Sequence, residues 1–358
     1  MPSRRSSTSR TARRTRRAHN VITSDNDAFA AGMSDIVPDR FKDSDRYLNV
    51  VQWNIEWFGA AKSTAKDKRR RAIVVDILKA LNADLFVFQE VAGPSADGRR
   101  EGVLDSIAEE LTAMGAGEYV VDYTRAGGEQ RVAMMWDREW VRTKDDVRDL
   151  FPRGTHPMPD GKDAFAGRTP LYGYFIARVP EVAAGPAPVS QKFEFQALGV
   201  HLKAMGDGHP QRLKSAMILA DWMSKDAPLI DADVMILGDW NAPPGDAKSW
   251  KPFHDLEKQN KVWFERINDP SDFSYMWLAN SSSRFVSRID LTAMSAASME
   301  KVSDVVAKTV RWKPIEDAIR DTGALTSPRV KAVMKELKET ISDHMPTATR
   351  FFFKAPEA

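Results

Sequence analysis

Several apolar runs of this sequence stop abruptly at an acid, an amide or an imidazole. The runs VVQW, LFVF, FQALGV and VMIL lead into Asn54, Gln89–Glu90, His201 and Gly238–Asp239 respectively. Short apolar runs of this kind indicate buried strands, and α/β folds place their functional side chains where strands end. The pattern therefore predicts an α/β fold with a polar site at the ends of its strands.

Strand and helix signals alternate from residue 47 onward, with no linker long enough to separate two domains. We expect strands at Tyr47–Ile55, Asp84–Glu90, Tyr119–Tyr123, Arg131–Trp136, Leu171–Val179, Lys192–Leu202, Asp233–Gly238 and Thr347–Phe353. We expect helices at Ala65–Asn82, Arg100–Met114, Gln211–Ser224 and Arg329–Ile341. Together they predict one domain over residues 46–358.

The first 45 residues have a different character. Residues 1–19 hold seven arginines and no acid, so the rest of the chain carries a net charge of about −5 although the whole carries +2. We expect residues 1–45 to be a disordered arm. The arm could contact nucleic-acid phosphates, or it could be an organelle transit peptide. The arginines are not followed by the apolar segment that a secretory signal requires. We therefore expect a cytoplasmic protein, and an organelle transit peptide is the alternative.

Composition excludes several classes of protein. No apolar run approaches the roughly 18 residues that a membrane-spanning helix requires. The chain has no cysteine, which excludes thiol nucleophiles, disulfides, iron–sulfur clusters and cysteine-based zinc sites. Carboxylates and amides at buried strand ends cost free energy unless they are paired or bind a cation, and oxygen ligands suit Mg²⁺ or Mn²⁺.

Two later motifs extend the set of polar strand ends. Asp290 ends the run SRI, and Asp343-His344 precede the final strand. Each motif alone has an ordinary explanation, since Asp290 could pair with Arg288 and Asp343 could cap a strand. The functional interpretation therefore depends on all of the motifs occurring together and in order.

The order WN, QE, H, GDWN, SRID and SDH resembles the endonuclease/exonuclease/phosphatase superfamily, which includes the pancreatic-type deoxyribonucleases. The resemblance extends from about residue 47 to residue 354, and GDWN with a distant SDH is its most specific part. It implies a four-layer α/β sandwich, in which two mixed β-sheets pack face to face with helices outside.

The resemblance also implies a metal site. Glu90 resembles the principal Mg²⁺ ligand of the family, with Asn54 beside it, and Mn²⁺ is a possible substitute. Asp343 would bind metal or orient the catalytic base.

The remaining implied roles concern the phosphate and the proton. Asp239 and Asn241 resemble the pair that orients the attacking water and holds a phosphate oxygen. His201 and Arg168, the latter in GRTP, resemble groups that contact the phosphate. His344 would be the general base or an imidazolium that stabilises the transition state, and Asp290 would hold its ring. The implied reaction is in-line attack of water on a phosphodiester, without a covalent intermediate.

Two departures narrow the choice within the superfamily. The exonuclease-type AP endonucleases carry a lysine soon after QE, whereas Ala92-Gly93 follow QEV here. The inositol-phosphatase branch carries a cysteine before its second aspartate, and SRID has none. Both departures favour the deoxyribonuclease-like or general phosphodiesterase branch. The long interval from Asp290 to Asp343 suggests a helical insertion over about residues 295–341.

We therefore expect a monomeric nuclease that acts on DNA. The alternatives are a phosphomonoesterase, a sphingomyelinase-like lipid phosphodiesterase, and an inactive nucleic-acid-binding module. The last alternative predicts the loss of at least one of five residues that are all present, namely Glu90, Asp239, Asn241, Asp343 and His344.

Overall fold

A computed structural model describes residues 46–59, 65–95, 97, 99–126, 130–165, 167–179, 191–243, 245–265, 272–276 and 286–354. The arm predicted for residues 1–45 lies outside the described residues. Within the described ranges, no helix has the length and apolar character that crossing a membrane would need.

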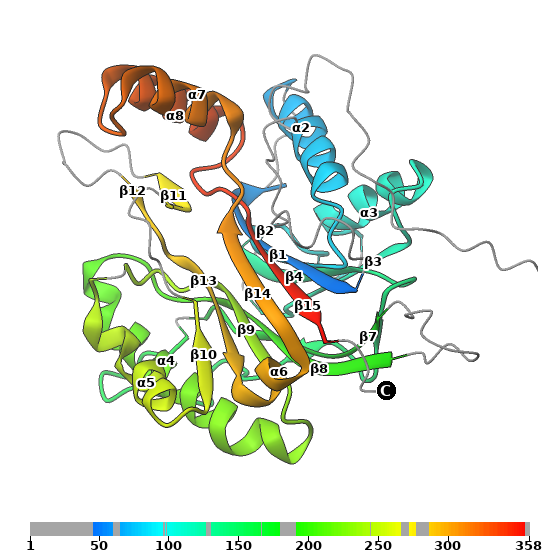
Figure 1. The fold of residues 1–358 in the computed structure, drawn as a ribbon, viewed down its shortest axis with the longest axis vertical. Helices are drawn as coiled ribbons and strands as arrows, with labels where there is room; N and C mark the ends of the chain where they lie inside the picture. Colours follow the sequence, from blue (N-terminus) through cyan, green and yellow to red (C-terminus); the bar gives the residue numbers. More distant parts are fainter. Residues whose placement is uncertain are drawn as a thin grey trace, which may run out of the picture.

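Two mixed sheets form the centre of the molecule (Figure 1). The first has the strand order β14 (Val302–Thr309), β15 (Thr347–Phe353), β1 (Tyr47–Phe58), β2 (Leu85–Val91), β4 (Arg131–Asp137) and β3 (Tyr119–Tyr123). The second has the order β10 (Val262–Phe264), β13 (Asp290–Ser295), β9 (Val234–Asp239), β8 (Gln191–His201), β7 (Leu171–Val179) and β5 (Val141–Thr143), and β6 (Arg148–Asp149) also pairs with β7. Each sheet contains one parallel pair, β1–β2 or β8–β9, among antiparallel neighbours.

Helices cover the outer face of each sheet (Figure 1). The first sheet is covered by α2 (Ala65–Leu81) and α3 (Val103–Ala113), and the second by α4 (His209–Asp221) and α5 (Ala247–Lys258). Short elements complete the described chain: α6 (Ala296–Lys301) follows β13, and β11 (Tyr275–Met276) pairs with β12 (Val286–Ser287).

Three apolar clusters show that the architecture has four layers. One cluster joins α2 and α3 to the first sheet, and another joins α4 and α5 to the second. The third lies between the sheets, where Val50 and Val87 of the first pack with Phe195 and Leu237 of the second. Because side chains alternate across a strand, each sheet presents one apolar face to its helices and the other to the opposite sheet. The predicted four-layer α/β sandwich is therefore confirmed.

The segment predicted as a helical insertion contains a strand, so that prediction was partly wrong. Residues 302–309, VSDVVAKT, form β14 and pair antiparallel with β15 at the edge of the first sheet. Its β-branched valines suit a half-buried edge strand. The rest of the segment is helical, with α7 (Lys313–Thr322) and α8 (Pro328–Thr340) forming a hairpin.

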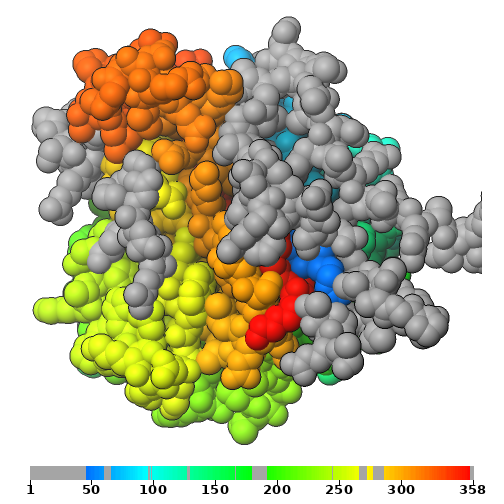
Figure 2. Space-filling view, in the orientation of Figure 1, coloured from blue at the N-terminus to red at the C-terminus, as the bar shows by residue number. Residues whose placement is uncertain are grey.

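The α7–α8 hairpin packs in the same apolar cluster as α2, α3 and the first sheet, to which it contributes Trp312, Ile315, Met334 and Leu337. Figure 2 shows it as the projecting orange part at the upper left of this face. Its second helix begins at Pro328, one residue before the predicted start, where the Ser327 hydroxyl accepts the Val330 N–H and the proline takes the first helical position.

Candidate active site

Backbone register alone brings three of the predicted residues side by side in the second sheet. Asp239, the last residue of β9, lies opposite His201 of β8 on one side and Asp290 of β13 on the other. All three are buried. In the first sheet, Asn54 lies opposite Gln89, so Glu90 follows at the adjoining end of β2. Residues of five strands therefore converge, as the sequence predicts, and a hydrogen bond from Asn54 to Asp239 joins the two sheets there.

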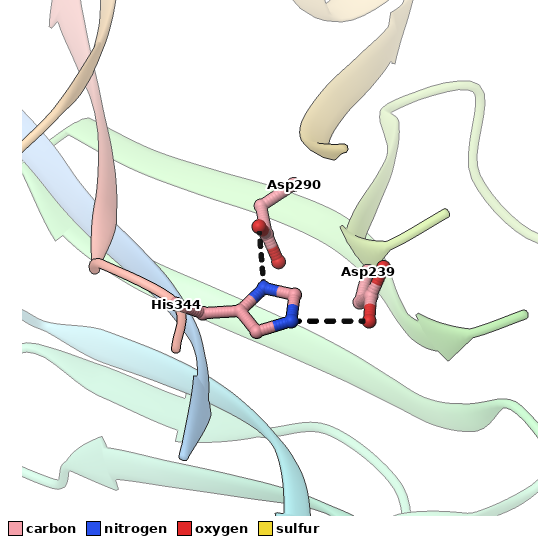
Figure 3. A group of neighbouring side chains, drawn as sticks. All are labelled: Asp239, Asp290 and His344. Carbon is pink, nitrogen blue, oxygen red and sulfur yellow. Dashed lines mark hydrogen bonds and ion pairs between the residues drawn. The ribbon is translucent and has the colours of Figure 1, made fainter. Parts of the chain in front are cut away.

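The imidazole of His344 is held by a carboxylate on one side and faces a second on the other (Figure 3). Its Nδ1 lies 2.9 Å from Oδ2 of Asp290, and its Nε2 lies 3.9 Å from Oδ2 of Asp239. The ring of Tyr275 lies against it, at 4.7 Å between ring centroids. The structure thus joins His344 to Asp290, the partner that the resemblance implies.

The backbone of His344 is tied to the end of β1. The Trp53 indole donates to the His344 carbonyl, at 3.0 Å, and the Ser342 hydroxyl donates to the Asn54 carbonyl, at 2.9 Å. The same hydroxyl accepts the His344 N–H. These bonds fix the loop before β15, and with it the position of the imidazole.

Electrostatics set the protonation of this cluster. Burial lowers the pKa of His344, but the charges of Asp290, Asp239 and Asp343 and the hydrogen bond to Asp290 outweigh it and raise that pKa to about 10. Burial, together with the charge of Asp290, raises the pKa of Asp239, although the charge of His344 opposes the shift. His344 is therefore an imidazolium at neutral pH, and Asp239 is more basic than an ordinary aspartate.

Glu90 is oriented by two amides and faces the same cluster. Its Oε2 accepts from Nε2 of Gln130 at 2.9 Å, and its Oε1 lies 3.4 Å from Nδ2 of Asn54. That same Asn54 amide donates to Oδ2 of Asp239 at 3.0 Å. Glu90 has a left-handed backbone, with φ of 59°, at a bulge between β2 and β4. Bulges and strained residues concentrate at functional sites, where they re-aim side chains.

The donor set fits a hard divalent cation. Oxygens of Glu90 and Asp239 both lie near Nε2 of His201, at 3.5 and 3.6 Å, so two carboxylates face one small volume. One carboxylate oxygen of Asp290 is buried without a hydrogen-bond partner. A second grouping, formed by Asp239, Asp290 and His344, offers ligand atoms within 4.8 Å of one another and could also hold a metal ion. Such concentrated carboxylates suit oxygen-coordinated metals.

His201 has the opposite electrostatic character to His344. Burial, then the charges of Arg168 and His344, lower its pKa well below the usual value. The Arg168 guanidinium contacts Nε2 at 2.7 Å and also donates to the Leu202 carbonyl at 3.0 Å. A neutral His201 accepts the guanidinium N–H, so the arginine is anchored beside the cluster.

Asn241 completes the end of β9. It has a left-handed backbone, with φ of 50°, and its side-chain amide donates to Oδ2 of Asp239 at 2.9 Å and to the Leu202 carbonyl at 3.0 Å. Its N–H donates to Oδ1 of Asp239 at 2.8 Å. The GDWN turn therefore holds the Asp239 carboxylate in one orientation.

Asp343 is paired with a residue that sequence analysis did not single out. Its Oδ2 lies 3.0 Å from Nζ of Lys338, in the last turn of α8, and its Oδ1 lies 3.9 Å from Nε2 of His344. Glu56, at the bulged end of β1, is its electrostatic neighbour. Arg288 pairs with Glu265 and lies 3.6 Å from Asp272, and the charge of Asp290 acts on it as a weaker contribution that raises its pKa.

All nine residues that sequence analysis nominated therefore lie in one connected cluster or one contact away from it. Sequence analysis missed Glu56, Gln130, Tyr275 and Lys338. Glu56 had a signal, because it follows Asn54 by two residues at the same strand end. The other three had none, since they reach the cluster from segments whose local pattern is ordinary.

Several carboxylates beside a histidine that another carboxylate holds are an arrangement typical of metal-dependent hydrolases. Residues 51–344 match the Endonuclease/Exonuclease/phosphatase family, and the chain belongs to it. Members of this family are metal-dependent phosphodiesterases and related phosphohydrolases, and this protein is an enzyme of that class. A search of curated proteins finds no match to the sequence.

Solved structures show the same fold at low sequence identity. The human Nocturnin catalytic domain with bound sulfate anion is 14% identical, with a TM-score of 0.53 over 89% of this chain and 99% of its own. An endonuclease/exonuclease/phosphatase from Bacteroides vulgatus is 14% identical, with a TM-score of 0.53 over 86% of this chain and 99% of its own. A humanized D. rerio TDP2 is 12% identical, with a TM-score of 0.51 over 86% and 99%.

Proposed function

We propose that the enzyme is a Mg²⁺-dependent nuclease that hydrolyses phosphodiester bonds in DNA. The observation that carries the proposal is the arrangement of His344 between Asp290 and Asp239, with Glu90 at the end of the facing strand. In this arrangement His344 would carry a proton, the carboxylate of Asp239 would bind the attacking water, and the nearby carboxylate of Glu90 would bind the cation.

In this proposal Glu90 is the principal ligand of the cation, with Asn54 beside it. When bound, the cation would neutralise charge on the phosphate oxygens. The Asn54 and Gln130 amides orient the Glu90 carboxylate, as groups behind a metal ligand commonly do.

Asp239 orients the attacking water and accepts its proton. Its raised pKa favours this role, and the amides of Asn54 and Asn241 fix its carboxylate. The oxygen of the water forms a bond to phosphorus while the bond from phosphorus to the leaving oxygen breaks.

The charged groups around Asp239 would stabilise the phosphorane-like transition state. His344, protonated at neutral pH, stabilises the negative charge or donates its own proton to the leaving oxygen, while Asp239 keeps the proton taken from the water. Arg168, which His201 anchors, would contact a phosphate oxygen. Asn241 would hold a second oxygen.

The arginine-rich residues 1–19 favour a polynucleotide over a small phosphoester. Seven cations without an acid attract a polyanion, whereas the rest of the chain carries a net negative charge. A phosphomonoesterase would have no use for several phosphate contacts along a strand.

One panel of substrates tests this function. The purified enzyme would be assayed with Mg²⁺ or EDTA against plasmid DNA, single-stranded DNA, RNA, a phosphomonoester and sphingomyelin vesicles. We expect cleavage of DNA with Mg²⁺ and none with EDTA. Faster turnover of the phosphomonoester or of sphingomyelin than of DNA would contradict the nuclease assignment, while activity in EDTA would contradict metal dependence itself.

A further inference from the structure

Trp57 is a large aromatic residue that the fold leaves in solvent close to the candidate site. It is 52% exposed, whereas Trp53 of the same strand is fully buried. It follows Asn54 by three residues, and the Asn54 amide donates to Asp239 and lies near Glu90. Because an aromatic ring gains free energy from burial, an exposed ring at this place requires a physical explanation.

The exposure of Trp57 is produced by a bulge in β1. Trp53 and Ile55 belong to the apolar cluster that joins the first sheet to α2 and α3. Regular alternation along the strand would send Trp57 to the same helix-covered face. Instead, the pairing of β1 with β2 shifts between Asn54 and Phe58, and Phe58 joins that cluster. The bulge therefore turns Trp57 out of the core.

The backbone at this bulge is strained and is held in place. Glu56 and Trp57 are both left-handed, with φ of 36° and 55°, a conformation that residues with a Cβ rarely adopt. Arg70 of α2 donates to the Glu56 carbonyl at 2.8 Å, and its Cζ lies 5.5 Å from the centre of the Phe58 ring. Contacts on both sides of Trp57 thus maintain a costly conformation, as is common at functional sites.

The position of Trp57 limits what it can contact. Three residues of extended chain span at most roughly 11 Å, so Trp57 lies within that distance of Asn54. Phosphates follow one another about every 3.4 Å along one strand of DNA. A strand with one phosphate at the site would therefore bring a base to Trp57 within a few nucleotides of the scissile bond.

An exposed indole ring beside a DNA strand finds a matching partner in the flat face of a base. Such stacking tolerates any sequence, because every base has this face. In a duplex the faces are covered by neighbouring base pairs, whereas in a single strand they are available. We propose that Trp57 stacks on an unpaired base, so that the enzyme acts preferentially on single-stranded DNA. The inference rests on the proposed nuclease function and names its substrate more narrowly.

The affinities of the full chain for three labelled probes, measured by fluorescence anisotropy in EDTA, test this inference. The probes are a short thymidine oligomer, an abasic oligomer of the same length and a duplex of that length. We expect Trp57→Ala to bind the thymidine oligomer about 5- to 100-fold more weakly, the range that loss of one stacked base implies. Its affinity for the other probes should hardly change, because the abasic oligomer has no bases and the duplex stacks its own.

Three further variants serve as controls. Trp57→Phe keeps an aromatic face and should retain most of the affinity, whereas Trp57→Leu keeps only an apolar side chain and should behave like Trp57→Ala. Met217→Ala is matched in exposure, since Met217 is 50% exposed on the outer helix α4, and it should bind all three probes as the wild type does. Thermal unfolding of each variant would verify that the fold persists.

Cleavage of DNA by the wild type with Mg²⁺, assayed in parallel, separates this inference from the proposed function. If the wild type cleaves DNA but Trp57→Ala binds the thymidine oligomer equally tightly, the inference alone is overturned. An equal loss of affinity for the abasic oligomer or the duplex would also overturn it, because stacking on an unpaired base predicts no such loss. A wild-type enzyme that neither binds nor cleaves DNA would contradict the nuclease proposal, and the inference with it.

Discussion

His201 and His344 approach the same carboxylate oxygen with the same ring nitrogen. Their Nε2 atoms lie 3.6 and 3.9 Å from Oδ2 of Asp239. Their pKa values nevertheless move in opposite directions, because burial and the charge of Arg168 lower that of His201, whereas carboxylates overcome the effect of burial at His344. Environments that separate two similar groups in this way assign them different roles. Here His344 is an imidazolium with a proton on both ring nitrogens, whereas His201 is a neutral imidazole.

Asp290→Asn should lower the pKa of His344, because it removes the carboxylate on Nδ1. If the imidazolium is the active form, wild-type turnover is present below the raised pKa of His344 and is lost as the pH rises through about 10. In the variant this alkaline limb should move toward the ordinary histidine value of about 6.5. The check is the pH dependence of kcat on bis-p-nitrophenyl phosphate. An alkaline limb that stays in place would show that another group titrates there.

Glu90→Gln should abolish turnover while the fold persists. The amide has the same size as the carboxylate and can still accept from Gln130, but it lacks the charge that a divalent cation requires. Activity and thermal unfolding would be measured together, with Glu194→Gln as a control at a surface salt bridge to Lys144. Near wild-type turnover in Glu90→Gln would remove this residue from the metal site.

Arg288→Met should be strongly destabilising. Arg288 and Glu265 form an ion pair in which the side chains are 1% and 5% exposed, and Glu265 also accepts the Thr292 N–H at 3.0 Å. Removing one partner leaves a buried charge without compensation, which typically costs about 3–5 kcal/mol. Urea unfolding of Arg288→Met, Glu265→Gln and the double variant should show strong coupling, with the double variant losing less than the sum. Additive losses would mean that the pair contributes little.

Deletion of residues 1–19 should weaken binding to duplex DNA at low salt. Each arginine that contacts a phosphate contributes about 0.9 to the slope of log K against log salt, so the slope should flatten by several units. Turnover of bis-p-nitrophenyl phosphate should hardly change, because the residues of the candidate site lie between 54 and 344. An unaltered salt slope would show that the arm makes no contact with DNA.

Much of the fold followed from local patterns in the sequence. The apolar runs marked the central strands, and β3, β7 and β15 have the predicted bounds. The polar strand ends marked the site, because the register of parallel and antiparallel neighbours brings such ends together. Strand β14 was not predicted. Its valines are half-buried only because β15 lies beside them, and the local sequence pattern contains no information about that neighbour.

The chemistry of the site depended on contacts that no local pattern contains. The sequence by itself determined the family, the two histidines and the carboxylates, since these are properties of residue type and order. Only the tertiary structure decided that Arg168 lies on His201, that Gln130 orients Glu90 and that Lys338 pairs with Asp343. Protonation follows from burial and from charges brought near by folding, so residues that look alike in the sequence acquire different pKa values in the folded protein.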